Sequence, residues 1–255
     1  MIEKLKNLLQ NDLITFSVLY RIIQQEHEYL ESDYENYIIC YSEKPYPIWL
    51  WTKENISDEK LNEAISKLIA KYPLSNGFTY NVRKEIANKI PNSEIRISMI
   101  SYTLNELKNI NYVNGKTKKA TMDDFALVTK YMNNFYKEAF QDSRNDLDEY
   151  EIRKKALNKI NKGEFYLFEN IEGVKVALTM LSYDKDIAHI SYVYTVPEFR
   201  RMGYAESLVH FLCKMALEKN FTPTLYADES YIASNNCYVK LGFKKRGSIV
   251  ELKSK

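Results

Sequence analysis

The sequence is poor in glycine and cysteine, has no long apolar run and carries almost no excess of either charge. Glycine contributes 7 of 255 residues, under half of the usual fraction of about 7%, so each glycine marks a position where the backbone needs it. The three cysteines, Cys40, Cys213 and Cys237, show no CxxC spacing. This excludes a disulfide framework and a four-ligand zinc site, so we expect a cytoplasmic protein that holds no metal.

The charge balance argues against nucleic acid and membrane as partners. Lys and Arg total 36 and Asp and Glu total 34, which leaves a formal charge of +2. No apolar run approaches the roughly 18 residues of a membrane span, and the N-terminal segment MIEKLKNLLQND mixes acidic residues into an amphipathic pattern. Apolar residues make up 45% of the chain, which is enough to build a core. We expect a globular chain with neither a secretory signal nor a membrane-spanning segment.

The first half alternates helical and strand patterns. Apolar residues at three- and four-residue intervals predict helices up to residue 23 and, after the capping residue Ser57, from 58 to 72. Short apolar runs at 37–41 and 47–52 predict a hairpin. In the second of these runs Trp49 and Trp51 share a face, where they either line an acceptor pocket or pack at a domain interface.

A polar segment at 105–119 is the best candidate for a domain boundary, and we place the two domains at 1–112 and 113–255. After this segment, the pattern of apolar residues predicts a series of strands interleaved with helices. Strands interleaved with helices indicate an α+β or α/β sheet. The expected elements are helices at 122–140, 145–162, 203–218 and 231–240 and strands at 164–171, 174–183, 187–196, 222–227 and 242–252.

One turn in this series has the properties of an anion site. The strand at 187–196 enters the helix at 203–218 through the basic segment PEFRRMGYA. Unpaired backbone N–H groups at the positive end of a helix dipole attract phosphate. Arg200 and Arg201 add positive charge, and Gly203 and Ala205 let a phosphate approach the backbone. Taken alone, the same turn is equally consistent with a basic helix end that faces solvent.

A second motif makes the chain similar to a known family. The segment TLYADESYIASNNCYVKLGFKKRG contains Tyr238 followed by Gly242 and Phe243. Together with the R-x-x-G-x-A turn, it resembles the GNAT family of acetyl-CoA-dependent N-acetyltransferases over roughly residues 116 to 252. The resemblance implies a mixed, splayed sheet flanked by helices for 113–255. Residues 1–112 are expected to form a smaller α/β domain, which a degenerate first copy of the same fold would explain.

The resemblance also implies a site for acetyl-CoA as co-substrate. The pantetheine arm is expected to bond the backbone of Val193, Tyr194 and Thr195 as an added strand. The pyrophosphate is expected on the turn, and two residues of the last helix are expected to contact the coenzyme. The expected cofactor-binding residues of these last two groups are Arg200, Arg201, Met202, Gly203, Tyr204, Ala205, Glu206, Ser234 and Asn235.

The reaction implied is direct attack by a primary amine on the thioester, with two proton transfers. Tyr238 matches the family's general acid, because a phenol with an ordinary pKa near 10 is protonated at neutral pH. His189 stands where some family members carry a glutamate base, and an imidazole titrates near neutrality; a structural histidine is the other interpretation. Glu198 and Tyr192 are weaker candidates for the base. The cysteines are interpreted as small core residues, because no base and orienting partner accompany them.

One departure from the family leaves function open. Many family members carry an asparagine seven residues before the tyrosine, and here that position is Tyr231. The chain is therefore expected to acetylate a small-molecule or protein amine, or else to sense acetyl-CoA without catalysis. A phosphate-ligand binder unrelated to acetyl transfer is a third interpretation. The oligomeric state is left open, with a homodimer among the alternatives.

Overall fold

The computed structural model describes residues 1–139 and 148–255, so residues 140 and 145–147 of the two helices expected around this gap lie outside the described residues. Within the described residues, the chain divides into two compact units. Unit 1 comprises 1–102, 227–232 and 245–255, and unit 2 comprises 103–226 and 233–244. The C-terminal strand therefore belongs almost wholly to unit 1. Whether independent domains meet at 112–113 stays a prediction.

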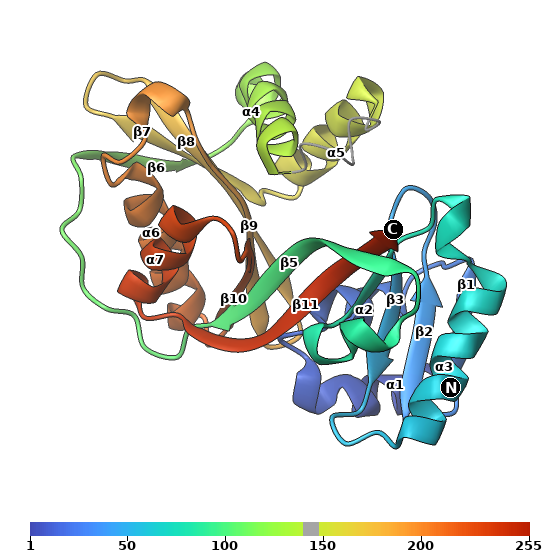
Figure 1. Cartoon of the computed structure of the whole chain (residues 1–255). Helices are drawn as coiled ribbons and strands as arrows, with labels where there is room; N and C mark the ends of the chain where they lie inside the picture. Colours follow the sequence, from blue (N-terminus) through green and yellow to red (C-terminus); the bar gives the residue numbers. More distant parts are fainter. Residues whose placement is uncertain (140–147) are drawn as a thin grey trace. The chain divides into compact units, whose positions relative to one another are not determined.

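Unit 1 contains a mixed sheet whose strand order is β1-β2-β3-β4-β11-β5. Its first three strands are antiparallel, β3 and β4 are parallel, and β11 is antiparallel to β4 (Figure 1). Its elements are α1 (Ile2–Leu9), α2 (Ser17–Ile22), β1 (Tyr29–Ser32), β2 (Tyr37–Tyr41), β3 (Ile48–Thr52), α3 (Asp58–Lys71), β4 (Tyr80–Arg83), β5 (Ser93–Thr103) and β11 (Lys244–Ser254), with 3-10 turns at Gln10–Asp12, Leu74–Asn76 and Lys84–Lys89. The expected hairpin at 37–41 and 47–52 is confirmed.

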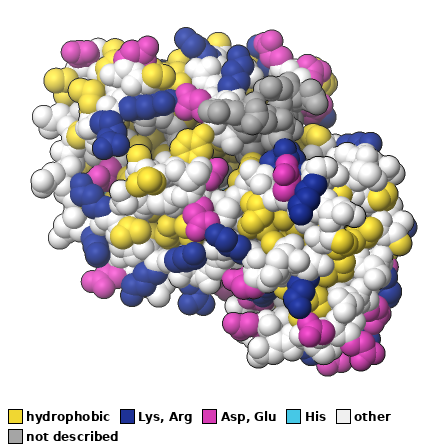
Figure 2. Space-filling model, viewed as in Figure 1, with side chains coloured by type: hydrophobic (Ala, Val, Ile, Leu, Met, Phe, Trp, Pro, Cys, Tyr) yellow, Lys and Arg dark blue, Asp and Glu magenta, His cyan; other side chains and the backbone are white. Residues whose placement is uncertain are grey.

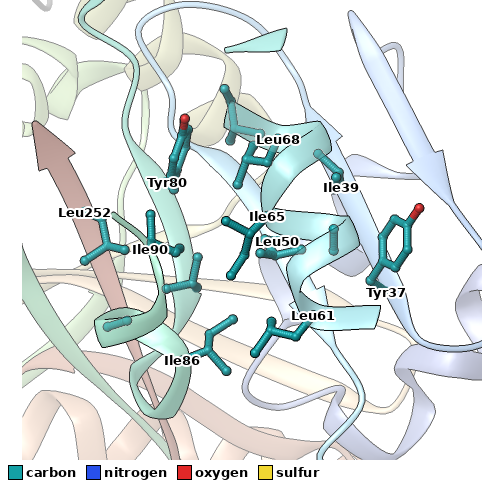
Figure 3. Packing of buried hydrophobic residues seen from close by; sticks show 14 of the residues in the cluster. Tyr37, Ile39, Leu50, Leu61, Ile65, Leu68, Tyr80, Ile86, Ile90 and Leu252 are labelled. Atoms are coloured by element: carbon teal, nitrogen blue, oxygen red, sulfur yellow. The ribbon is translucent and has the colours of Figure 1, made fainter. Parts of the chain in front are cut away.

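The core of unit 1 follows from the spacing of apolar residues in α3. Leu61, Ile65 and Leu68 recur at helical intervals and point toward Leu50 and the other buried strand residues (Figure 3). Ser57 begins the helix by accepting the backbone N–H of Lys60 at 3.3 Å. A side-chain oxygen at this position satisfies one of the otherwise unpaired N–H groups of the first turn.

Unit 2 contains the strands β10-β9-β8-β7-β6 in that order. Its strands pair antiparallel except β9 and β10, which are parallel. Its elements are β6 (Gly115–Lys119), α4 (Phe125–Ala139), α5 (Glu149–Asn161), β7 (Phe165–Asn170), β8 (Lys175–Asp184), β9 (Ile187–Thr195), α6 (Tyr204–Glu218), β10 (Thr222–Asp228) and α7 (Ile232–Leu241), with 3-10 turns at Met122–Asp124 and Pro197–Phe199. The last two residues of β10 and the first residue of α7 belong to unit 1.

Helices cover both faces of the strands β7 to β9. On one face α4 and α5 bury Val128, Met132 and Ile152 against Leu178 and other strand residues. On the other face lies α6, where the Tyr166 hydroxyl is 4.0 Å from the Met215 sulfur (Figure 1). The chain therefore has the expected fold class, a mixed α+β sheet flanked by helices. This order of strands and helices determines where the candidate site lies in unit 2.

Candidate functional site

The strand β9 has one edge that is only half paired. It pairs with β8 along its length, from Ile187 to Thr195. It pairs with β10 only from Ile187 to Ile190, which stands opposite Leu225. Beyond Ile190 the edge of β9 that faces away from β8 is open within unit 2. This is the splay that the sequence resemblance implies.

A bulge marks the point at which β9 leaves β10. The register with β8 shifts between Leu178 and Met180, so that β9 contributes one residue more than β8. Tyr192 lies in this bulge with a φ of 54°, in the left-handed region. A bulge bends its strand and redirects the side chains around it. Here it places Tyr192 on the face covered by α4 and α5.

The backbone of Thr195 faces the open edge. The Val196 N–H donates to the Val176 carbonyl at 3.0 Å, which fixes the direction of alternate backbone groups along this pair. By that alternation Tyr194 also points its N–H and carbonyl toward β8, and Thr195 points them away. The Thr195 carbonyl accepts a hydrogen bond from Nε–H of Arg200 at 3.0 Å. The strand end is thus shaped for a ligand that bonds to backbone groups.

The turn after β9 leads to a helix N-terminus without a side-chain cap. Arg201 and Gly203 have φ values of 65° and 84°, and Gly203 is the N-cap of α6. The first N–H bonded to the N-cap carbonyl is that of Ser207, at 3.0 Å. The N–H groups of Tyr204, Ala205 and Glu206 therefore have no acceptor within the helix. Together with the helix dipole they favour an anion.

Gly203 is required by space as well as by conformation. A Cβ at this position would lie 2.9 Å from Cγ1 of Val113. Val113 also donates its backbone N–H to the Ser207 hydroxyl at 3.2 Å. The segment interpreted from the sequence as a candidate domain boundary thus lies against the first turn of α6. This contact was not predicted, because Ser207 looks like any small residue on a buried helix face.

The two arginines of the turn have different surroundings. Arg200 forms two hydrogen bonds with the Glu138 carboxylate, at 2.7 and 2.8 Å, so its charge is matched and it fastens the turn to α4. Arg201 is exposed and has no hydrogen-bond or ion-pair partner in the part of the chain that the structure describes. Of the two, Arg201 is the one available to an anion. Met202, beside it, is 53% exposed.

The last helix, α7, carries the motif residues and is joined to the first turn of α6. Lys240 of α7 forms an ion pair with Glu206 of α6 at 2.7 Å, which joins the two helices. Tyr238 is buried, and its ring centroid lies 5.9 Å from that of Phe243. Gly242, with a φ of 105°, could not carry a Cβ, which would lie 2.5 Å from the Glu106 carbonyl oxygen. These contacts explain the spacing of the tyrosine and the glycine.

Two further expected residues lie in the first turns of α7, and the position at which many family members carry an asparagine comes just before the helix. Ser234 and Asn235 are half-buried and come one turn before Tyr238. Tyr231 precedes the helix, donates its N–H to the Asp228 carbonyl at 3.2 Å and is 42% exposed. The residue that replaces the usual asparagine therefore belongs to the helix entry rather than to its buried face.

His189 lies on β9 before the open edge. Its Nδ1 is 3.4 Å from the Thr224 hydroxyl, and its ring centroid is 5.5 Å from that of Tyr226. It stands opposite Ser182 in the register with β8. It is buried on the sheet face that also carries Tyr192. The structure brings together the turn and the last helix, and it separates His189 from them along the strand.

The cysteines of unit 2 have the properties of core residues. Burial raises the pKa of Cys213, and it raises the pKa of Cys237 to about 11. Both side chains therefore remain thiols at neutral pH, and a thiol is a poor nucleophile. Among residues 1–139 and 148–255 no group of three or more metal-ligating side chains occurs. Likewise, no helix in the described ranges is long and apolar enough to span a membrane.

Charged side chains of both signs are mixed on the face of the molecule that the space-filling view shows. On the face shown in Figure 2, Lys and Arg side chains occur among Asp and Glu side chains. This agrees with the formal charge of +2 for the whole chain.

The comparisons with known proteins agree with the geometry of unit 2. Residues 129–243 match the model of a family described as "Acetyltransferase (GNAT) family". This confirms the resemblance for the C-terminal part of the chain. No curated protein matches the sequence.

Solved structures share the fold over nearly the whole length. An acetyltransferase from the GNAT family of Colwellia psychrerythraea is 14% identical, with a TM-score of 0.62 over 100% of this chain and 97% of that one. A GCN5-related N-acetyltransferase from Kribbella flavida is 10% identical, with a TM-score of 0.64 over 96% and 95%. A functionally unknown conserved protein from Staphylococcus epidermidis is 15% identical, with a TM-score of 0.60 over 95% and 98%. The likeness includes both units.

Proposed function

Since residues 129–243 form a domain of the GNAT acetyltransferase family, we propose that the chain moves acetyl from acetyl-CoA to a primary amine by direct attack. One observation carries the proposal. The open backbone edge of β9 at Thr195 leads directly into the uncapped N-terminus of α6. A ligand with an extended amide arm and a phosphate at its end matches that pair of features.

Each part of acetyl-CoA has a proposed partner. The pantetheine amides bond to the backbone of Val193 and Thr195, as a strand would. The pyrophosphate lies on the N–H groups from Arg201 to Glu206, with the Arg201 guanidinium beside it. Arg200 acts through the turn, because its guanidinium binds Glu138 and the Thr195 carbonyl. Ser234 and Asn235 complete the site from α7.

The chemistry needs two proton transfers and no enzyme nucleophile. The acceptor ammonium first loses a proton, and its nitrogen then attacks the thioester carbon. As the tetrahedral intermediate collapses, the C–S bond breaks and the thiolate of coenzyme A takes a proton, while the nitrogen gives up its second proton and so restores the proton donor. We assign the proton that the thiolate takes to the Tyr238 hydroxyl. We assign the first proton transfer to His189 acting through water, since His189 precedes the bulge by three residues.

A second candidate function is a module that binds acetyl-CoA without catalysis. Tyr231 favours it, because an exposed ring replaces the family's asparagine at the entry to α7. We favour the enzyme, because Tyr238 keeps its place in the helix joined to the turn.

With three unpaired thiols in the chain, a reducing compartment such as the cytoplasm suits the protein.

Two measurements test the proposal. Release of free coenzyme A should depend on both acetyl-CoA and an amine from a broad panel, and no dependence on any amine would favour the sensing module. Coenzyme A at about 100 times its dissociation constant should stabilise the fold by roughly 2.7 kcal/mol. An equal stabilisation by ATP would instead favour a general phosphate binder.

A further inference from the structure

A lysine and two tyrosines meet beside the bulge of β9. The hydroxyls of Tyr136 on α4 and Tyr192 on β9 lie 2.5 Å apart. Nζ of Lys155 on α5 lies 3.1 Å from the Tyr136 hydroxyl and 5.4 Å from the centroid of the Tyr192 ring. Phe135 and Phe165 pack on Tyr192, with ring centroids at 5.2 and 5.9 Å. We call Lys155, Tyr136 and Tyr192 the lysine-tyrosine cluster.

Among residues 1–139 and 148–255, no carboxylate matches the positive charge of the cluster. The other charged residues of α5 pair locally, Arg153 with Glu149 and Lys154 with Glu151, both at 3.9 Å. Lys155 has no carboxylate partner in the part of the chain that the structure describes. Lys155 is half-buried, and removing an ammonium from water without a counter-charge is costly. Such a cost is accepted most readily where a ligand supplies the missing charge.

The hydrogen-bonding capacity of the cluster points to the same conclusion. An ammonium offers three donor hydrogens and no acceptor, and each phenol offers one donor hydrogen. Donors therefore outnumber acceptors. Burial acts against the charged form of Lys155, but the Tyr192 and Tyr136 oxygens outweigh it and leave the pKa above its ordinary value. Burial raises the pKa of Tyr192, so its hydroxyl stays protonated. The complement of this set is a small anion with several acceptor lone pairs.

The position of the cluster relates it to the acetyl group. Tyr192 immediately precedes Val193, where the pantetheine arm is proposed to end. Ser191, on the other side of Tyr192, stands opposite Met180 and thus faces the same side of the sheet. Its Oγ is buried and has no hydrogen-bond partner within the described ranges. An amine held at this face would lie between an unused hydroxyl and a cationic cluster. The opposite face is covered by α6.

We propose that the acceptor is a free amino acid, whose carboxylate binds Lys155 and the Tyr136 and Tyr192 hydroxyls while its amine faces the thioester. This assignment rests on the proposed function. Lys155 is then a specificity-determining residue, because it contacts the acceptor away from the reacting atoms. Charge-assisted hydrogen bonds to a carboxylate are among the stronger polar contacts in proteins. The amide of the same amino acid lacks the negative charge and should bind less well.

The test compares each of the twenty standard L-amino acids with its α-carboxamide. For the acceptor that reacts fastest, kcat/KM should exceed that of its carboxamide by at least about tenfold, as expected for a hydrogen bond to a charged group. Lys155→Met should reduce this ratio to near one, mainly through KM. Lys154→Met, at an exposed neighbouring position, should leave the ratio as in the wild type. Tyr136→Phe provides a second variant if Lys155→Met does not fold.

The outcomes separate this inference from the proposed function. If every carboxamide reacts as well as its amino acid, the inference is wrong and the acetyltransferase proposal stands. If no amine reacts, the acetyltransferase proposal fails, and melting temperatures decide the inference. With coenzyme A present, at least one amino acid should then raise the wild-type melting temperature more than its carboxamide does, and Lys155→Met should remove the difference. Equal shifts would overturn the inference.

Discussion

The two units share one order of three strands, a helix and a parallel strand, but they differ at the turn that leads into the helix. In unit 1 the strands β1-β2-β3 lead into α3 and the parallel strand β4. In unit 2 the strands β7-β8-β9 lead into α6 and the parallel strand β10. The repeat supports the hypothesis that the first half is a degenerate copy of the second. It also allows the ligand site of one unit to be compared with its counterpart in the other.

The helix N-termini show what a phosphate site requires. In unit 1 the Ser57 side chain accepts a hydrogen bond from a backbone N–H in the first turn of α3. Asp58 and Glu59 add negative charge to the same turn. In unit 2 the N-cap is Gly203, which has no side chain, and the one first-turn carboxylate, Glu206, is paired with Lys240, while Arg201 adds positive charge just before the helix. Carboxylates at a helix N-terminus stabilise the helix and repel other anions. The same crossover therefore serves folding in one unit and, as we propose, ligand binding in the other.

The ends of the two entering strands show a further likeness and a further difference. An arginine Nε donates to the carbonyl of the last strand residue in both units, Arg83 to Thr52 at 3.1 Å and Arg200 to Thr195 at 3.0 Å. In unit 1, however, Trp51 is buried and donates its Nε1–H to Asp12 at 2.8 Å. Trp49 is buried beside Phe16. The tryptophans belong to the core and do not line an exposed pocket.

The largest effect is expected when the chain is cut at the predicted boundary of 112–113. The fragment 113–255 retains β11 but loses β4, its antiparallel partner in unit 1. Val250 and Leu252 of β11 are fully buried in the core that contains α3. We expect the fragment to show no cooperative thermal unfolding by circular dichroism. A cooperative transition with retained coenzyme A binding would show that residues 113–255 form an independent domain.

The next effect concerns the hydroxyl of Tyr238. Tyr238→Phe keeps the packing on Phe243 and removes the proposed proton donor. Turnover should fall by roughly 10² to 10⁴ fold, while acetyl-CoA affinity in calorimetry stays unchanged. The matched variant in unit 1 is Tyr80→Phe, which removes a buried hydroxyl bonded to the Tyr72 carbonyl. It should lower stability by about 1 kcal/mol and leave turnover unchanged. A loss of less than threefold for Tyr238→Phe would mean that water protonates the thiolate.

The paired arginines provide a smaller and more specific comparison. Arg200→Ala releases the turn from Glu138 and from Thr195, so acetyl-CoA affinity should fall by about tenfold as binding has to order the turn again. Arg83→Ala breaks the equivalent bond in unit 1 together with the ion pair to Asp12. It should lower the melting temperature without changing that affinity. If Arg83→Ala weakened acetyl-CoA binding as much as Arg200→Ala, the assignment of the site to unit 2 would be wrong.

Many of the helices and strands could be predicted from the local sequence. Which strands pair with one another in the sheet could not. Helix α6 and the turn before it follow from apolar spacing and from one glycine. The short, half-exposed strand at Tyr29–Ser32 has no clear apolar alternation and was not predicted. The membership of β11 in unit 1 depends on a partner more than 160 residues away, which periodicity does not encode.

The candidate site shows the same limit. Motif spacing identified the turn and Tyr238, but Lys155 stands in a charged helix where nothing in the sequence distinguishes it from Lys154. Its role depends on Tyr136 and Tyr192, which only the fold brings to it. The polar segment at 105–119 was interpreted only as a candidate boundary, yet its Lys108 N–H donates to the Leu241 carbonyl at 3.0 Å. Polar composition gave no sign of that contact.

The smallest effect is a pH dependence in a turn of unit 1. Asp33 accepts the backbone N–H groups of Glu35 and Asn36 at 3.0 and 2.7 Å. Burial raises its pKa, but the hydrogen bonds outweigh burial and bring the pKa from 3.8 down to about 2. The stability contributed by Asp33 is therefore present above pH 3.8 and lost as the pH falls toward 2.

Asp33→Asn should remove this pH dependence and lower the melting temperature by about 2 to 4 °C at neutral pH. Asp123→Asn, at an exposed position of unit 2, is the control. At each pH it should melt at the same temperature as the wild type. The melting temperatures are measured from pH 2 to pH 7. Parallel curves for the wild type and Asp33→Asn would contradict the prediction.

The stoichiometry of acetyl-CoA binding tests most directly whether one of the two repeated units carries the site. Titration calorimetry should give one site per chain, lost in Gly203→Glu, where the new side chain meets Val113 and adds negative charge at the turn. Gly77→Ala is the matched control, because Gly77 has a similar φ of 81° and open space around it; it should keep the site. Two sites per chain, or undiminished binding in Gly203→Glu, would contradict the account.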